Sequence, residues 1–156
     1  MRNRVILFLI FLIILVGCKS GKETVVRPSP TFYSDQVAMI GVEKKLGILG
    51  PDFVVNTANK YMWHFWDTNE ELQLKSLRVE AINVKTKQKV KGLVKDVSTP
   101  QETLVWEYDS IGGPNNGADA HTPSILMLPS SGLWQLDAYL GGEYFESIIV
   151  NVKDPS

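Results

Sequence analysis

The stretch from Gly132 to Val152, GLWQLDAYLGGEYFESIIVNV, decides the fold. Apolar and polar residues alternate on both sides of Gly141-Gly142, as in strands whose successive side chains point to opposite faces. A glycine pair supplies the positive φ values that a two-residue hairpin turn requires. The pattern predicts an antiparallel hairpin with one apolar face, formed by Trp134, Leu136, Ala138, Leu140, Ile148, Val150 and Val152.

Short apolar segments continue this pattern toward the N-terminus. They lie between glycine, proline and polar turn residues at 37–40, 46–49, 53–55, 60–66, 75–84, 103–108 and 124–128. Segments of this length between turn signals are typical of strands, and the chain has no long helical period or internal repeat. The sequence therefore predicts an all-β fold, an antiparallel β-sandwich of about 7–9 strands.

The most aromatic segment is Lys60–Trp66, KYMWHFW. A period of two places Tyr61, Trp63 and Phe65 on one face and Met62, His64 and Trp66 on the other. Both faces are largely apolar, so we expect a strand with a loop over its second face rather than an exposed face. Any aromatic ring left exposed could stack on sugars or anchor a protein partner, and the candidates are Tyr61, Trp63, Trp66 and Trp106.

The N-terminus has the layout of a secretory signal peptide. Met1–Arg4 contains two arginines and no acidic residue, twelve apolar residues follow from Val5 to Val16, and Gly17 precedes Cys18. A helix of twelve residues spans about 18 Å, whereas a bilayer core of about 30 Å needs about 20 residues. A transmembrane helix extended to Gly21 is the alternative, and it would have to bury the charge of Lys19.

The segment Leu15-Val16-Gly17-Cys18 resembles the lipobox of bacterial lipoproteins. This resemblance implies that residues 1–17 are removed and that the Cys18 thiol receives a diacylglyceryl group, with the new amine often acylated. Two or three acyl chains hold a protein durably on a membrane. Cys18 is the only cysteine, so the chain has no internal disulfide. The expected location is the extracytoplasmic face of the cell membrane.

The remaining chain divides into a tether and one domain. Residues 18–31 include KSGKETVVRPSP, a polar and proline-rich composition typical of a linker, and residues 32–153 contain the predicted strands. Without Arg2 and Arg4, fourteen basic residues oppose seventeen acidic ones. A weakly acidic domain without an arginine-rich face is a poor nucleic-acid binder, so we expect no nucleic-acid partner.

Four segments, KYMWHFW, GADAHTPS, SSGLWQLDAYL and FESIIVNV, resemble a family of small, uncharacterised lipoproteins of Gram-positive bacteria with an immunoglobulin-like domain. The resemblance covers roughly Phe32 to Val152. It implies an immunoglobulin-like sandwich and a membrane location, and it implies no activity or site residue. The disulfide of antibody domains is absent, because only one cysteine is present.

Enzymatic motifs are weak. Asp119, His121 and Ser124 could supply a hydrolase triad, but residues so close in sequence rarely adopt triad geometry, and no GxSxG elbow is present. We expect a non-enzymatic protein without a cofactor, a membrane-anchored module that binds protein or cell-wall glycan. The alternative is a copper-binding lipoprotein, because thioether and imidazole ligands suit Cu(I), and its ligands would be Met62, His64, His121 and Met127.

Overall fold

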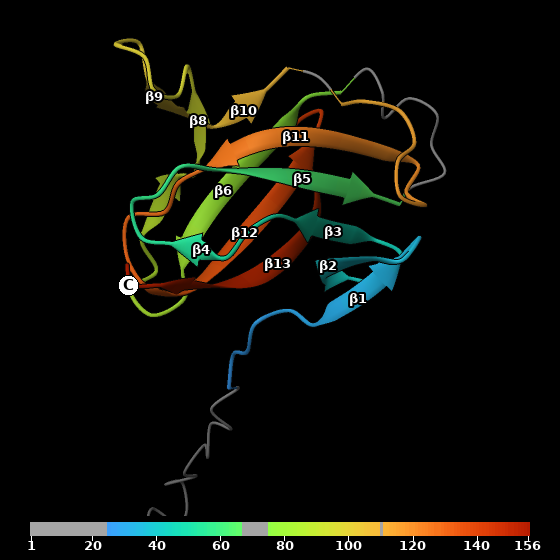
Figure 1. The fold of residues 1–156 in the computed structure, drawn as a ribbon, viewed down its shortest axis with the longest axis horizontal. Coiled ribbons are helices and arrows are strands. Elements are labelled where there is room, and N and C mark those ends of the chain that lie inside the picture. The colour runs from blue at the N-terminus through green and yellow to red at the C-terminus, as the bar shows by residue number, and fades with distance from the viewer. Residues whose placement is uncertain (1–24, 67–74, 110) are drawn as a thin grey trace, which may run out of the picture.

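The computed structural model describes residues 25–66, 75–109 and 111–156, and within these ranges the secondary structure is entirely β (Figure 1). Thirteen strands form two sheets. The first sheet has the order β1 (Thr31–Ser34), β2 (Val37–Val42), β3 (Leu46–Leu49), β5 (Asn59–Phe65), β11 (Ala120–Leu126), β8 (Leu93–Lys95) and β9 (Thr103–Val105). The second has the order β10 (Glu107–Tyr108), β6 (Leu77–Asn83), β12 (Gly132–Leu140), β13 (Glu143–Lys153) and β4 (Phe53–Val54), with β7 (Lys89–Lys91) paired to β6.

The two sheets pack face to face around one core, so the predicted all-β sandwich is confirmed. Strand pairing is antiparallel except between β4 and β13, which run parallel. The thirteen strands exceed the expected number because five of them, β4, β7, β8, β9 and β10, have only two or three residues. Such short strands carry no readable alternation.

The predicted hairpin is confirmed as β12 and β13. Trp134 lies opposite Val150 and Leu136 lies opposite Ile148, and all seven residues expected on the core face are buried. Gly141 and Gly142 have φ values of 60° and 87°, as the two-residue turn requires. The register shifts by one residue between Ala138 and Tyr139, which is a β-bulge near the turn.

The core side of β5 supplies the largest side chains of the first sheet. Tyr61, Trp63 and Phe65 are buried against the second sheet, and the Tyr61 ring stacks on Phe53 at 4.3 Å between centroids. Trp63 donates a hydrogen bond of 2.9 Å from its indole nitrogen to Ser124 Oγ on the neighbouring strand β11. Each buried aromatic side chain removes a large apolar area from water, so β5 and β11 are fixed in register by packing.

The chain joins the sandwich just before β1. Ser29 exchanges two hydrogen bonds of 2.8 Å with Ile149 of β13, one through its backbone nitrogen and one through its hydroxyl oxygen. The signal peptide and Cys18 lie outside the described residues. Within the described part of the chain, no helix is long and apolar enough to cross a membrane.

Candidate functional site: the Trp66 cleft

On the outer face of β5, the loop of residues 111–119 covers His64, as expected for a strand with a loop over its second face, whereas Met62 and Trp66 are half-buried. Asn116 donates a hydrogen bond of 3.0 Å from its side-chain amide to Nε2 of His64, and His64 is fully buried. Ser34 Oγ donates to the Asn116 carbonyl oxygen at 2.8 Å. The loop therefore joins β1 and β5 across the outside of the first sheet.

His64 and His121 are directly opposite each other on β5 and β11, with ring centroids 6.4 Å apart. Burial, and then the nearby charge of His121, lowers the pKa of His64 to about 4, so this imidazole is neutral at pH 7. His121 Nδ1 is hydrogen-bonded to the Gly113 carbonyl oxygen at 2.7 Å. Each ring thus uses one of its two nitrogens for a loop contact, and His64 Nδ1 is buried without a hydrogen-bond partner among the described residues.

The four candidate copper ligands do not come together. Met62 and His64 share the outer face of β5, but Met127 follows the end of β11 and lies six residues from His121, about 20 Å along an extended chain. In the described ranges, no group of three or more His, Cys, Asp or Glu residues could hold a metal ion. The geometry gives no support to a copper centre built from this set.

The three residues of the candidate triad do not converge either. His121 lies on the outer face of β11, whereas Ser124 points into the core and accepts the hydrogen bond of Trp63. Asp119 is exposed before the strand begins. A sheet separates the base from the nucleophile, so these residues cannot act as a hydrolase triad.

The four aromatic candidates have different positions. Tyr61 and Trp63 are buried in the core, where no ligand can reach them. Trp106 is half-buried between β9 and β10, and the Arg78 guanidinium lies 6.0 Å from its ring. Trp66 is half-buried at the end of β5 and lines a surface cleft of about 420 Å³.

This cleft, called the Trp66 cleft below, is formed where four segments meet. Its lining comes from β1 with the turn after it, the β2–β3 turn, the end of β5 and the loop before β11, with residues Phe32, Tyr33, Ser34, Asp35, Glu43, Lys44, Trp66, Gly117 and Asp119. Figure 1 shows these segments together at one end of the sandwich. A concave site of this size is in the range that small ligands occupy in proteins.

The Trp66 ring has a fixed position. Its indole nitrogen donates a hydrogen bond of 2.7 Å to the Gly117 carbonyl oxygen, and the Phe32 ring meets it edge-on at 5.7 Å between centroids. The backbone nitrogen of Trp66 donates to the carbonyl oxygen of Lys45 at 3.1 Å. Because the indole is already ordered, a ligand that stacks on it loses little side-chain entropy on binding.

The turns around the cleft have unusual backbone conformations. Asp35, Gln36, Lys44 and Asn116 all have positive φ values, between 45° and 65°, although none is glycine. Left-handed backbone costs a non-glycine residue about 1–2 kcal/mol, and such residues are often found at ligand sites. The conformations bring Asp35 against Gly117 on the other side of the cleft, where a Cβ atom would lie 3.3 Å from the Asp35 carboxylate.

The charge of the cleft is negative and uncompensated. Its lining contains three carboxylates, from Asp35, Glu43 and Asp119, and one ammonium group, from Lys44. All four side chains are exposed, and none has an ion-pair partner among the residues that the structure describes. Of the cleft residues, the sequence pattern singled out only Trp66, as an aromatic candidate, and Asp119, as a possible triad member, because the others come from separate turns.

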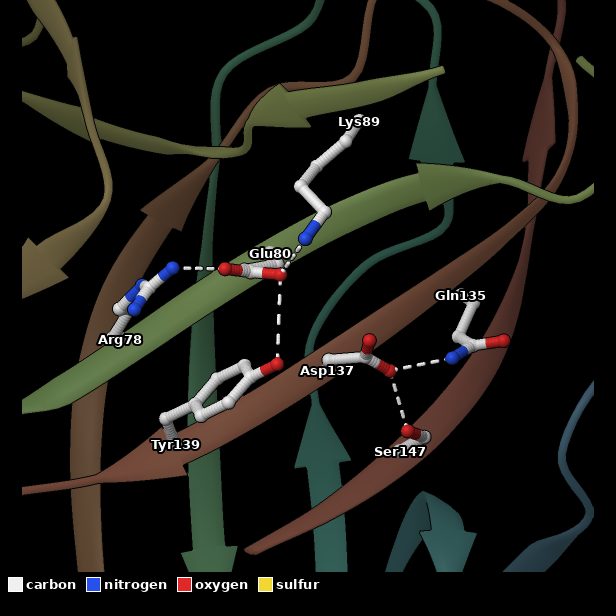
Figure 2. A network of polar contacts seen from close by, with 7 residues as sticks. All are labelled: Arg78, Glu80, Lys89, Gln135, Asp137, Tyr139 and Ser147. Carbon is white, nitrogen blue, oxygen red and sulfur yellow. Dashed lines mark hydrogen bonds and ion pairs between the residues drawn. The ribbon is translucent and has the colours of Figure 1, made fainter. Parts of the chain in front are cut away.

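A second polar cluster lies on the outer face of the second sheet, and its carboxylates, unlike those of the cleft, are paired with described side chains (Figure 2). Glu80 is buried and forms ion pairs with Arg78 and Lys89, while Tyr139 donates to it at 3.5 Å. Asp137 accepts hydrogen bonds from Gln135, at 2.6 Å, and from Ser147. Both oxygens of Glu80 and Oδ1 of Asp137 thus have partners within the protein, so this cluster stabilises the sheet.

Comparison with known proteins identifies a family and a fold. A family model described as "Domain of unknown function (DUF4871)" matches residues 19–150. The comparison with curated proteins gave no match. Among solved structures, the chain is similar to the crystal structure of a protein described as a "Putative Lipoprotein from Bacillus anthracis", with 21% identity over 85% of this chain and 89% of that one and a TM-score of 0.65. At this identity the likeness shows a shared fold.

Proposed function

We propose that this chain, which belongs to the family described as "Domain of unknown function (DUF4871)", is a membrane-anchored lipoprotein. Its sandwich domain binds an extracytoplasmic ligand in the Trp66 cleft. The ligand is a protein or a cell-wall glycan. The observation that carries the proposal is a cleft of about 420 Å³ that combines an ordered, half-buried indole with three carboxylates that have no ion-pair partner in the described part of the chain.

Two observations support the anchor. The sequence Leu15-Val16-Gly17-Cys18 resembles a lipobox, and the structural relative from Bacillus anthracis is itself described as a "Putative Lipoprotein". A lipid on Cys18 and the following tether would place the sandwich at the outer surface of the cell membrane. There the Trp66 cleft would be available to wall polymers and to other surface proteins.

The position of the aromatic side chains supports a binding role for the cleft. Trp66 and Phe32 form one wall, and Tyr33, which is 71% exposed, lines the same cleft. Aromatic rings that combine an apolar face with a polar group are common at interfaces and on sugar-binding surfaces. The other large exposed tyrosine, Tyr144, lies on the second sheet beside the second polar cluster and outside the cleft.

Site-specific cross-linking in cells tests the binding role. A photoreactive phenylalanine analogue replaces Tyr33 in the full-length lipoprotein, and the same analogue replaces Tyr144 in a matched control. We expect adducts from position 33 that decrease with Trp66→Ala, and far fewer from position 144. Digestion with a muramidase distinguishes glycan adducts from protein adducts. Equal adduct yields from the two positions, or none from position 33, would exclude the cleft as the ligand site.

The anchor has its own test. Mass spectrometry of the protein from native membranes should find residues 1–17 absent and an acylated N-terminal residue at position 18. Cys18→Ala should prevent acylation and release the protein from the membrane fraction. A bare thiol on an uncleaved chain would refute lipidation and leave the cross-linking result unaffected.

A further inference from the structure

We infer that the Trp66 cleft binds an amino sugar through its protonated amine, so that the preferred ligand is a de-N-acetylated segment of a glycan. This inference rests on the proposed function and adds the chemical class of the ligand. It follows from the combination, around one cavity, of aromatic side chains with three carboxylates from separate segments that have no ion-pair partner among the described residues.

The charge selects a cation. Three carboxylates against one lysine give the lining a net charge of −2 (1 − 3), and none of these groups is neutralised by a described neighbour. An anionic wall polymer would be repelled by this surface, whereas an ammonium group would be attracted both to the carboxylates and to the face of Trp66.

The spacing favours several cationic or hydrogen-bonding groups over a metal ion. Asp35, Glu43 and Asp119 come from three different segments, and in the described part of the chain no three acidic or imidazole groups lie close enough to hold a metal. Separated carboxylates suit a ligand whose amines and hydroxyls recur along its length. An oligosaccharide of amino sugars has this distribution.

The aromatic side chains favour a sugar over a lysine side chain. Trp66 is held by Gly117 and Phe32, and Tyr33 adds a second exposed ring to the same cleft. A sugar ring presents an apolar face to such a surface and keeps its polar groups at its edges for the carboxylates that line the same cleft. A lysine side chain would use one carboxylate and leave most of the cleft unfilled.

Two oligosaccharides with the same backbone test the inference. Full-length lipoprotein in detergent micelles is titrated at pH 6 with glucosamine tetramer, whose amines are protonated, and with N-acetylglucosamine tetramer, which is uncharged. Binding is followed by calorimetry. We expect the amine form to bind at least about tenfold more tightly, and the difference to shrink when the salt concentration rises from tens of millimolar to about 0.5 M.

Charge-matched variants separate the cleft from the overall charge of the domain. Asp35→Asn, Glu43→Gln and Asp119→Asn together should abolish the preference for the amine form. The control combines Glu107→Gln, Glu143→Gln and Asp154→Asn, three exposed acidic residues outside the cleft, and should retain the preference. Both triple variants have the same net charge, so non-specific attraction would affect them equally.

Several results would overturn the inference. One is equal or tighter binding of the N-acetylated tetramer, and another is the absence of binding by either sugar. A trilysine peptide that competes as well as the glucosamine tetramer would also overturn it, in favour of a peptide ligand. In each case the cross-linking at position 33 still decides independently whether the cleft is the ligand site.

Discussion

Trp66 donates the hydrogen bond of its indole nitrogen to the carbonyl oxygen of Gly117, 51 residues later in the chain, at 2.7 Å. This bond joins the end of β5 to the loop before β11, and the same loop covers His64. The wall of the cleft and the cover over the outer face of β5 are therefore one structure. Changes in either residue should affect stability and binding together.

Trp66→Phe should keep an aromatic wall and lose the indole hydrogen bond. Because Trp66 is half-buried, we expect the free energy of unfolding to fall by about 1 kcal/mol, the usual net worth of such a bond. Trp66→Ala also removes the contact with Phe32 and should cost about 2–3 kcal/mol. Urea denaturation measures both values.

Trp106→Phe is the control for this pair, since Trp106 is also half-buried but lies outside the cleft. It should leave ligand binding unchanged, whereas Trp66→Ala should weaken it. If the two tryptophan positions affected binding equally, the assignment of the cleft would be wrong.

Gly117→Ala should destabilise the loop for two reasons. Gly117 has a φ of 75°, which L-residues rarely adopt, and a Cβ atom there would lie 2.7 Å from Ser34 Oγ. We expect a loss of about 1–3 kcal/mol in the free energy of unfolding. Gly142→Ala is the matched control, because its φ of 87° is similar and its Cβ would have no neighbour within 4 Å.

The difference between these two glycine variants isolates the contact with Ser34. Thermal denaturation at a fixed pH measures it. Equal destabilisation would show that backbone strain alone is responsible and that the loop can move away from β1 at no cost.

Local patterns in the sequence predicted much of the fold. The hairpin of β12 and β13 carries its alternation and its turn within twenty-one consecutive residues, so register and core face followed directly. In Lys60–Trp66 both faces are apolar, and alternation predicted the two faces without showing which was core. The structure places Trp63 in the core and Trp66 at the surface.

The Trp66 cleft could not be predicted in the same way. Its walls come together because β5 pairs with β3 on one side and with β11 on the other, although β11 begins 55 residues after Phe65. Strand order depends on the packing of the whole core. Asp35 and Glu43 appear in the sequence only as turn residues, and no local pattern relates them to Asp119.

The burial of His64 predicts a loss of stability in mild acid. Because folding lowers the pKa of His64 to about 4 from an ordinary value of 6.5, the folded state resists the proton that the unfolded state accepts. The contribution of the neutral His64 to the free energy of unfolding is complete above pH 6.5, and it is lost as the pH falls from 6.5 to about 4. A shift of this size corresponds to about 3 kcal/mol.

Urea denaturation at several pH values measures this slope. His64→Asn should show a much smaller decrease between pH 6.5 and 4. His121→Gln should keep most of it, because burial is a larger cause of the His64 shift than the charge of His121. A wild-type stability that stays constant over this range would contradict the buried, neutral imidazole.

Glu80→Gln should lower the free energy of unfolding by more than the loss of a surface ion pair does. The hydrogen bond from Lys89 and the charge of Arg78 lower the pKa of Glu80. The ionised carboxylate therefore contributes to the free energy of unfolding above the ordinary carboxyl pKa, and this contribution is lost as the pH falls through the lowered pKa. Its side chain is only 5% exposed, whereas the partner side chains are 36% and 50% exposed and can regain water. We therefore expect a loss of about 1–2 kcal/mol at pH 7, less than for a fully buried pair. The control is Asp52→Asn, which breaks the exposed pair with Lys153 and should lower the free energy of unfolding by less than about 0.5 kcal/mol. Urea denaturation measures both variants. Equal effects would show that the burial of Glu80 adds nothing to the stability that its ion pairs provide.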